Sequence, residues 1–281
     1  MLRTTCLGLV CALTFTTAAT AETVSIGASK DNTLFEDFLG RFSSGAGPSL
    51  FVGITGGGFI RRGVVQFDVA SAVPAGATVT GATMTLFMDR TVSGAQDQNM
   101  HRLLMDWGEA GSVASGGGGG GGAALPGDAT WLHGFFNTTL WVNEGGEYNP
   151  AISAAQSVGG IGSYSWSSAQ LAADVQDMLD NPGDNFGWII IGVELGGDTA
   201  KRYATKENSS AINRPRLEIE YTMAAECVGD INGDGVVDTA DLGILIGQFG
   251  TAGPDGDLNG DMVVDTADLG ILIGAFGTPC P

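Results

Sequence analysis

Near the C-terminus, a 23-residue segment occurs twice with almost no change. The first copy, residues 229–251, reads GDINGDGVVDTADLGILIGQFGT, and the second, residues 256–278, reads GDLNGDMVVDTADLGILIGAFGT. Twenty of the 23 aligned positions are identical, and the period is 27 residues. A repeat this short is one supersecondary unit used twice, in which each copy buries the apolar face of the other. The duplication therefore predicts a small module of two like halves.

Oxygen-bearing side chains occupy positions 1, 3, 5, 9 and 12 of a loop in each copy. In the first loop these are Asp230, Asn232, Asp234, Asp238 and Asp241, and position 7 offers the carbonyl of Val236. In the second they are Asp257, Asn259, Asp261, Asp265 and Asp268, with the carbonyl of Val263. Calcium takes about six to eight hard oxygen ligands, so this spacing predicts one Ca2+ ion in each loop. The alternative is an Asp- and Gly-rich turn that holds no ion.

The two loops differ at position 6, where the chain must turn sharply. The first loop has Gly235 there and the second has Met262. Glycine adopts the turned backbone conformation without a steric penalty, and methionine does not. We therefore expect weaker calcium binding in the second loop.

Each loop is expected to lead into a helix. Leu242, Leu245 and Ile246 recur at helical spacing after the first loop, and the second copy repeats them. Asp238 is suited to cap this helix, because the N-terminal end of a helix dipole favours negative charge. Gly250 is expected to end the helix. No helix is expected before either loop.

In this arrangement the tail resembles a type I dockerin, which has two EF-hand-like calcium loops, each followed by a helix, with Asp at position 12. The resemblance covers about 55 residues and implies docking onto a cohesin module. Loop positions 10 and 11, usually a Ser/Thr pair in the family, are Thr239-Ala240 and Thr266-Ala267 here, and these four residues are the candidate cohesin contacts. Lys and Arg, usual in the following helix, are absent, so the resemblance names no particular cohesin.

The charge of the chain limits its partners. The formal net charge of −19 argues against nucleic acid and against an anionic membrane surface, which both need Lys and Arg. Residues 226–281 hold ten of the 31 acidic residues and none of the 12 basic ones. This shift in composition predicts a domain boundary near Ala225, with the dockerin module over 226–281.

Residues 1–21 are typical of a secretory signal peptide. Arg3 precedes a short apolar stretch, and Ala19-Thr20-Ala21 is a cleavage signal. A buried N-terminal strand is the alternative. The stretch is too short to span a membrane, so we expect a secreted protein without membrane insertion that begins near Glu22. Cys227 and Cys280 then remain, and an oxidising compartment favours a disulfide between them over two free thiols.

Residues 22–225 are expected to form a jelly-roll-like β-sandwich, so the fold class is mainly β with a small α-helical calcium module behind it. Alternating or β-branched stretches predict strands over Leu50–Thr55, Phe59–Val69, Thr78–Asp89, Phe186–Glu194 and Arg216–Thr222. One helix is expected over Ser167–Leu179. A Gly-rich insertion at about 108–127, with an unbroken run over Gly116–Gly122, is expected to be flexible.

Several stretches of this region are similar to the DNRLRE family of secreted bacterial proteins. They are KDNTL (30–34), FIRRGVVQFDV (59–69) with PAGATVTGATMTLF (74–87), GDATW (127–131) and KENSSAINRPRLEIEY (206–221). The resemblance implies a β-sandwich, and some members resemble carbohydrate-binding modules. A polysaccharide is therefore the partner that this resemblance implies.

Aromatic residues after the glycine run are the candidate glycan contacts. Trp141 and Tyr148 are preferred, and Trp131 and His133 complete the set. Aromatic rings stack on sugar faces while polar neighbours bind hydroxyls. The alternative, which we favour, is that these rings anchor a long surface loop on the sandwich. Arg61 and Arg62 leave a similar choice between an anionic sugar and an ion pair with Asp68 or Asp89.

No catalytic motif is evident, so the sequence favours a protein without enzymatic activity. It lacks a nucleophile elbow, a phosphate loop and zinc-ligand spacing, and it has two His residues. Asp106 and Glu109 are the candidate carboxylate pair for glycoside cleavage. Three hypotheses follow: a lectin-like polysaccharide-binding protein assembled through its dockerin, a glycoside hydrolase or polysaccharide lyase, and a structural cell-surface or matrix protein.

Overall fold

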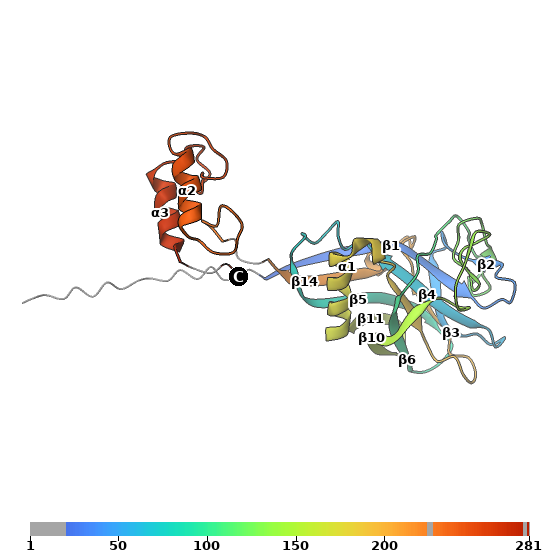
Figure 1. The fold of residues 1–281 in the computed structure, drawn as a ribbon. Coiled ribbons are helices and arrows are strands. Elements are labelled where there is room, and N and C mark those ends of the chain that lie inside the picture. The colour runs from blue at the N-terminus through green and yellow to red at the C-terminus, as the bar shows by residue number, and fades with distance from the viewer. Residues whose placement is uncertain (1–20, 224–226, 278–279, 281) are drawn as a thin grey trace, which may run out of the picture. The chain divides into compact units, whose positions relative to one another are not determined.

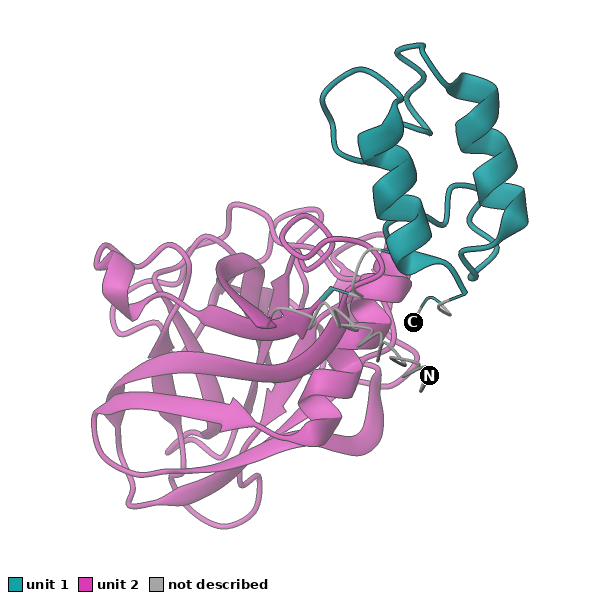
Figure 2. Ribbon diagram, turned by 90° about the vertical axis from the view of Figure 1, so that its left-hand side faces the viewer, with its two compact units in different colours: residues 1–20, 223–281 teal, residues 21–222 magenta. Residues whose placement is uncertain are grey.

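The computed structural model describes residues 21–223, 227–277 and 280. The chain divides into two compact units between Thr222 and Met223 (Figures 1 and 2). The predicted signal peptide lies outside the described residues, apart from Ala21. Among the described helices, none combines the length and apolar character that a membrane crossing requires.

The unit formed by residues 21–222 is mainly β, as the sequence predicted (Figure 1). Its strands are β1 (Ala21–Phe35), β2 (Phe42–Ser43), β3 (Ser49–Ile54), β4 (Ile60–Phe67), β5 (Thr78–Thr91), β6 (Gln96–Leu103), β7 (Gly122–Ala123), β8 (His133–Phe135), β9 (Thr139–Leu140), β10 (Tyr148–Val158), β11 (Gly162–Ser167), β12 (Trp188–Ile191), β13 (Lys201–Ala204) and β14 (Arg216–Thr222). Its helices are α1 (Ala169–Asp180) and the 3-10 turns η1 (Pro182–Asp184) and η2 (Ala211–Asn213).

Strand pairing closes six strands into an antiparallel ring in the order β1, β14, β5, β13, β3, β4. Strand β1 closes the ring because residues 21–27 pair with β14 and residues 28–35 pair with β4. Strands β12, β6 and β10 extend the sheet beyond β4, and β11 pairs with β5. The structure thus confirms the mainly β class as a six-stranded barrel with extra strands, and the jelly-roll connection stays a prediction.

The alternation that predicted the strands corresponds to their two faces. In β14, Leu217, Ile219 and Tyr221 are buried and Glu218 and Glu220 are exposed. Strands β3, β4, β5, β12 and β14 lie within the predicted ranges to within a few residues. Strand β6 went unpredicted because its sequence, QDQNMHRL, is mostly polar. Its buried side chains include Gln98, which accepts a hydrogen bond from Tyr203 Oη at 2.6 Å.

Helix α1 covers part of the barrel, and its predicted apolar face is confirmed. Leu171, Val175 and Leu179 are buried, and the helix packs against β5 and β10. Ser168 caps the N-terminus by accepting a hydrogen bond from the Leu171 N–H at 3.0 Å. On the same face lies Asp174, a buried acid that accepts hydrogen bonds from the Trp188 indole and the Ser153 hydroxyl.

Replacing Asp174 by Leu is expected to destabilise the β unit by about 2–6 kcal/mol. The substitution leaves two buried donors without an acceptor, and each orphaned donor costs about 1–3 kcal/mol. Asp174→Asn keeps one side-chain oxygen and is expected to cost less than half as much. Urea unfolding followed by tryptophan fluorescence measures both values, and equal costs for the two variants would contradict the assignment.

The glycine run makes defined contacts with the barrel. The carbonyl of Gly119 accepts a hydrogen bond from Arg61 Nε at 3.0 Å, and Gly122 in β7 pairs with Ser43 in β2. A Cβ on Gly121, which has a φ of +73°, would meet the Phe42 Cβ at 2.9 Å. Glycine is therefore required here for close packing as well as for backbone freedom, and the predicted flexibility of the insertion stays a prediction.

The C-terminal unit contains α2 (Thr239–Gln248) and α3 (Thr266–Ala275), each directly after its loop as predicted. Val237, Leu245, Val264 and Leu272 form its fully buried core, two residues from each copy. The Gly277 N–H donates to the Val237 carbonyl, and the Gly250 N–H donates to the Val264 carbonyl, both at 2.8 Å. The end of each helix is thus bonded to the loop of the other copy, so neither half is complete alone.

Candidate calcium centres

The carboxylate at loop position 1 organises the turn that follows it. Asp230 Oδ1 accepts hydrogen bonds from the N–H groups of Gly233 and Asp234 at 2.8 and 3.1 Å, and Oδ2 accepts from Gly235 at 2.9 Å. In the second loop Asp257 accepts the corresponding bonds from residues 260, 261 and 262. Several N–H groups that converge on one carboxylate force the backbone to curl around that point.

The carboxylate at position 12 joins the two ends of the loop. Asp241 is fully buried and accepts hydrogen bonds from the N–H groups of Ile231, Asn232 and Asp238 at 2.8, 3.0 and 2.8 Å. Asp238 in turn caps α2 and completes a capping box with Asp241. Asp268 does the same in the second loop, with Leu258, Asn259 and Asp265 as donors.

These bonds keep the position-12 carboxylates ionised. Burial would raise the pKa of Asp241, but the bonds from Asp238, Asn232 and Ile231 outweigh it and lower the pKa below the usual value. For Asp268 the bond from Asp265 is the largest cause of a lowered pKa. A lowered folded-state pKa stabilises the fold at neutral pH, and that contribution is lost as the pH falls through the lowered value.

The middle ligand positions lie on the open side of each loop. Asn232 Oδ1 accepts a hydrogen bond from the Asp234 N–H at 2.8 Å, and Asp234 Oδ1 accepts from Val236 at 3.0 Å. Both side chains are exposed, whereas Asp230 and Asp238 are half-buried. Asn259, Asp261, Asp257 and Asp265 repeat this arrangement in the second loop.

The donor set fits a calcium ion. Each loop gathers four carboxylates, one amide oxygen and the carbonyl at position 7, all hard oxygen donors of the kind that Ca2+ prefers. Residues 226–281 contain no Lys or Arg to offset the negative charge. A divalent cation bound by Asp230, Asn232, Asp234, Val236, Asp238 and Asp241, and a second one bound by the matching residues, would supply that charge.

The backbone at position 6 differs in strain between the two loops. Gly235 has a φ of +90°, and Met262 has a φ of +71°. The left-handed region costs a residue with a side chain about 1–2 kcal/mol, whereas glycine enters it freely. The second loop therefore contains a conformational penalty that the first loop avoids.

Replacing Met262 by Gly is expected to tighten calcium binding at the second loop by up to about tenfold, because about 1.4 kcal/mol of relieved strain corresponds to that factor. Gly235→Met is the matched control and is expected to weaken the first loop by a similar factor. Calorimetric titration of the full chain resolves the change. Equal affinities of the two loops in the parent protein would contradict the role assigned to Met262.

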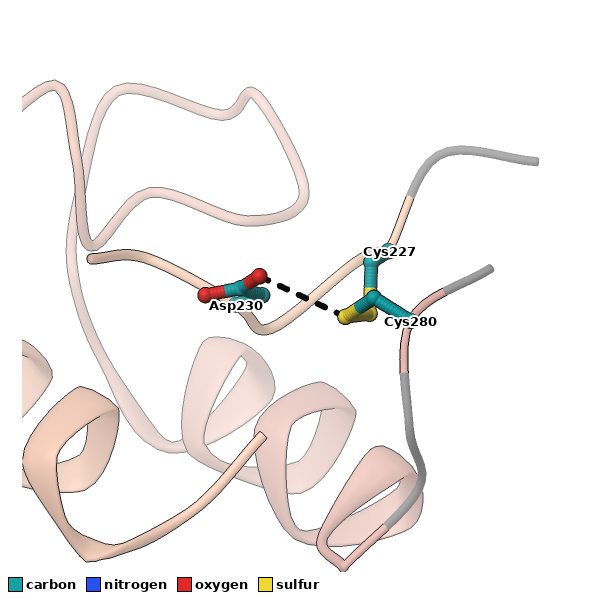
Figure 3. A group of neighbouring side chains, drawn as sticks. All are labelled: Cys227, Asp230 and Cys280. Atoms are coloured by element: carbon teal, nitrogen blue, oxygen red, sulfur yellow. Dashed lines mark hydrogen bonds between the residues drawn. A yellow bond between two sulfur atoms is a disulfide. The ribbon is translucent and has the colours of Figure 1, made fainter. Parts of the chain in front are cut away.

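The predicted disulfide between Cys227 and Cys280 is present, with a Cα–Cα distance of 5.4 Å, and it lies beside the first loop (Figure 3). The Cys280 sulfur is 3.4 Å from Asp230 Oδ2, and the Cys280 N–H donates to the Gly235 carbonyl at 2.9 Å. The bond links residues separated by 53 positions. Closure of a loop of that size stabilises the folded module by about 4 kcal/mol in the chain-entropy model.

The aromatic candidates for glycan contact occupy different environments. Trp131 and Trp141 are 7% and 5% exposed and belong to a core cluster, and the Trp141 indole donates to the Thr130 carbonyl at 2.8 Å. Rings so deeply buried offer no face to a sugar, which favours the alternative that they anchor the loop. His133 is half-buried and lies 2.9 Å from the Thr130 hydroxyl, and burial lowers its pKa.

Tyr148 lines an open pocket. It does so with Arg62, Asn143, Glu144, Gly146 and Pro150, around a volume of about 340 Å³. The Arg62 guanidinium lies over both the Trp131 and the Tyr148 rings, 5.0 and 5.7 Å from their centroids. The pocket therefore joins one aromatic ring to the guanidinium of Arg62, the amide of Asn143 and the carboxylate of Glu144.

The ion pairs expected for the two arginines are wrong. Arg62 binds Glu194 through two hydrogen bonds of 2.7 and 2.9 Å, and Asp89 pairs with Arg202 instead. Within the described residues Arg61 makes no ion pair. Its guanidinium lies 5.0 Å from the Phe35 ring centroid, and burial lowers its pKa to about 10. The sequence could not predict these partners, because each lies on a strand or loop that is distant along the chain.

The candidate catalytic carboxylates have separate partners. Asp106 pairs with Lys30 at 2.9 Å and is half-exposed. Glu109 pairs with Lys206 at 2.9 Å and accepts a hydrogen bond from the Asp31 N–H. Each carboxylate is thus engaged by a different ammonium group, which gives no support to a shared role in cleavage.

Comparisons with known proteins concern a small part of the chain. No protein-family model matches it, and no curated protein matches it. Six chains of solved structures are similar to it. One is described as "Type II cohesin-dockerin domain from Bacteroides cellolosolvens"; it is 44% identical, and the match covers 20% of this chain and 95% of that one, with a TM-score of 0.19.

That similarity is one of sequence over a short segment of the chain. Because a TM-score of 0.19 establishes no common fold, only the loop residues and their contacts support the two calcium centres. The disulfide between Cys227 and Cys280 is a bond of the kind that persists in oxidising, extracellular environments.

Proposed function

We propose that this protein is a secreted, non-catalytic adaptor that attaches a polysaccharide-binding domain to a cohesin-type partner. A signal peptide over residues 1–21 directs secretion, residues 22–225 form a DNRLRE-like domain, and residues 226–281 form a type I dockerin. The observation that supports the docking role best is the paired set of loops, in which the carboxylates at positions 1 and 12 are held by converging N–H groups.

The dockerin-like module exposes two copies of one apolar surface. On the first copy, Ile246 and Phe249 are 58% and 45% exposed, and on the second, Ile273 and Phe276 are 59% and 43% exposed. The candidate contact residues Thr239, Ala240, Thr266 and Ala267 are exposed at the start of the same helices. Exposed apolar side chains gathered on a small polar module favour a protein partner.

Calcium has a structural role in this proposal. The bound ion would neutralise the carboxylates of each loop, and the loop holds the N-terminal end of its helix through the capping box. Without the ion, the carboxylates of each loop repel one another, and the capping box that holds the start of each helix is weakened. Docking should therefore require calcium.

Binding to a panel of type I and type II cohesin modules tests the docking role, and it also decides the type. We expect binding in calcium and its loss with chelator. Ile246→Asp combined with Ile273→Asp should weaken binding on the order of 100-fold, because an unpaired charge in an interface costs about 2–5 kcal/mol. Each single variant should retain binding through the unaltered copy.

Ile161→Asp, at an isoleucine that is 69% exposed on the β unit, is the matched control and should bind as the parent does. The docking role would be abandoned if no cohesin of either type bound in calcium, or if binding survived the chelator.

Polysaccharide binding is proposed for the pocket that contains Tyr148. The Tyr148 ring can stack on a sugar face, and the side chains of Asn143 and Glu144 can bind its hydroxyls, while the charge of Arg62 is already paired with Glu194. The hydrolase or lyase alternative rests on Asp106 and Glu109. The structural-protein alternative needs no glycan at all.

A glycan array probed with the full chain separates these functions. We expect binding to a polysaccharide on the array that falls on the order of tenfold or more in Tyr148→Ala, since loss of a stacked ring costs about 1–2 kcal/mol. Phe38→Ala, at a ring that is 81% exposed, is the matched control. Reducing-sugar release that disappears in Asp106→Ala would favour the enzyme, and an array without binding would favour the structural protein.

A further inference from the structure

Three carboxylates from distant parts of the β unit meet at one point. Asp31 lies in β1, Glu109 lies in the segment after β6, and Glu207 lies in the turn after β13. One oxygen from each lies within 4.8 Å of the others. Asp31 is fully buried, and Glu109 and Glu207 are 12% and 24% exposed at their side chains. The group has a buried centre and a side that solvent reaches.

Two oxygens of this group lack a hydrogen-bond partner. Asp31 Oδ2 accepts from the Lys206 N–H at 2.7 Å, while Oδ1 is buried without a partner among the described residues. The same holds for Glu207 Oε2, whose other oxygen binds the Lys206 ammonium. Burying a carboxylate oxygen without a hydrogen-bond donor costs free energy. Two such oxygens in one cluster therefore point to a missing positive group.

Among the described residues, the ammonium of Lys206 contacts the cluster but does not balance its charge. Lys206 Nζ binds Glu109 at 2.9 Å and also binds Glu207, which offsets one of three negative charges. Lys30 lies nearby in sequence, but its ammonium binds Asp106 and the Trp107 carbonyl at 2.9 and 2.7 Å. Two negative charges therefore remain, which equals the charge of one divalent cation.

We infer that Asp31, Glu109 and Glu207 form a third cation site, within the β unit, that binds Ca2+. Carboxylate oxygens are hard donors of the kind that calcium takes, and the partly exposed Glu109 and Glu207 leave room for water as further ligands. The ion would lie at the junction of three segments and would join them. Burial raises the pKa of Asp31 well above its usual value, which is the cost that a bound cation would remove.

A shared proton between Asp31 and Glu207 is the competing explanation. It would satisfy the same two oxygens without any ion, because a protonated carboxyl donates to an ionised one. The two explanations differ in what the protein takes up: a cation binds in one case, and a proton alone binds in the other.

The aromatic residues allow this site to be observed apart from the dockerin-like loops. Residues 226–281 contain no Trp or Tyr, whereas Trp107 lies two positions before Glu109. Terbium(III), a hard cation that substitutes for calcium, emits when a nearby indole absorbs light. The test uses the full chain with Asp230, Asp241, Asp257 and Asp268 all replaced by Ala, so that both dockerin-like loops are disabled.

This loop-disabled chain is expected to bind one Ca2+ by equilibrium dialysis and to give indole-sensitised terbium emission that calcium displaces. Adding Asp31→Asn and Glu207→Gln should abolish both signals, and Asp106→Asn, the matched control outside the cluster, should leave them unchanged. Lys206→Met should tighten calcium binding on the order of tenfold, because it removes a competing positive charge.

The site is refuted if the loop-disabled chain takes up no calcium and shows no sensitised emission, which is the outcome of the shared proton. It is also refuted if uptake persists after Asp31→Asn and Glu207→Gln. The uptake measurement on the loop-disabled chain needs no change in the cluster, so it decides the question even if a cluster variant fails to fold. Failure of cohesin docking would leave this result untouched.

Discussion

Carboxylates held a few ångströms apart repel one another unless donors or cations lie among them, and this constraint shapes both units. In the C-terminal unit the answer is local, because backbone N–H groups from the same loop converge on Asp230 and Asp241. In the β unit the answer is long-range, because Lys206 and the N–H groups of residues 31 and 206 meet Asp31 and Glu109 from different segments. In both units, the carboxylates keep negative charge that these hydrogen bonds and ion pairs do not neutralise.

In the proposed function, docking depends on the helices, and the helices depend on the loops that precede them. The carboxylate at position 12 is also the third residue of the helix, so the group that would bind calcium is the group that completes the capping box. The exposed apolar residues that suit a partner lie farther along the same helices. In the proposed function, calcium, helix order and docking would therefore be coupled through a single side chain in each copy, Asp241 or Asp268.

The disulfide adds a second restraint to the first loop only. Cys280 touches Asp230 and bonds to the Gly235 carbonyl, so the end of the chain is held against that loop. The second loop lacks this restraint and also contains Met262 in a left-handed conformation. We therefore expect the two nearly identical loops to differ in stability, because of their surroundings and of one substituted position.

The sequence by itself determined the two carboxylate loops, the helices after them and helix α1, which follow from spacing within short stretches, where residue number and position in space are tightly linked. It also predicted the disulfide, because Cys227 and Cys280 are the two cysteines that remain after the predicted signal peptide. It also predicted strands such as β5 and β14, whose faces alternate, but not β6, whose buried residues are polar. Only the tertiary structure closed the barrel through β1, buried Trp131 and Trp141, and paired Arg62 with Glu194. It also brought Asp31, Glu109 and Glu207 together. Such contacts depend on which distant strands become neighbours, and no local pattern of residues encodes that choice.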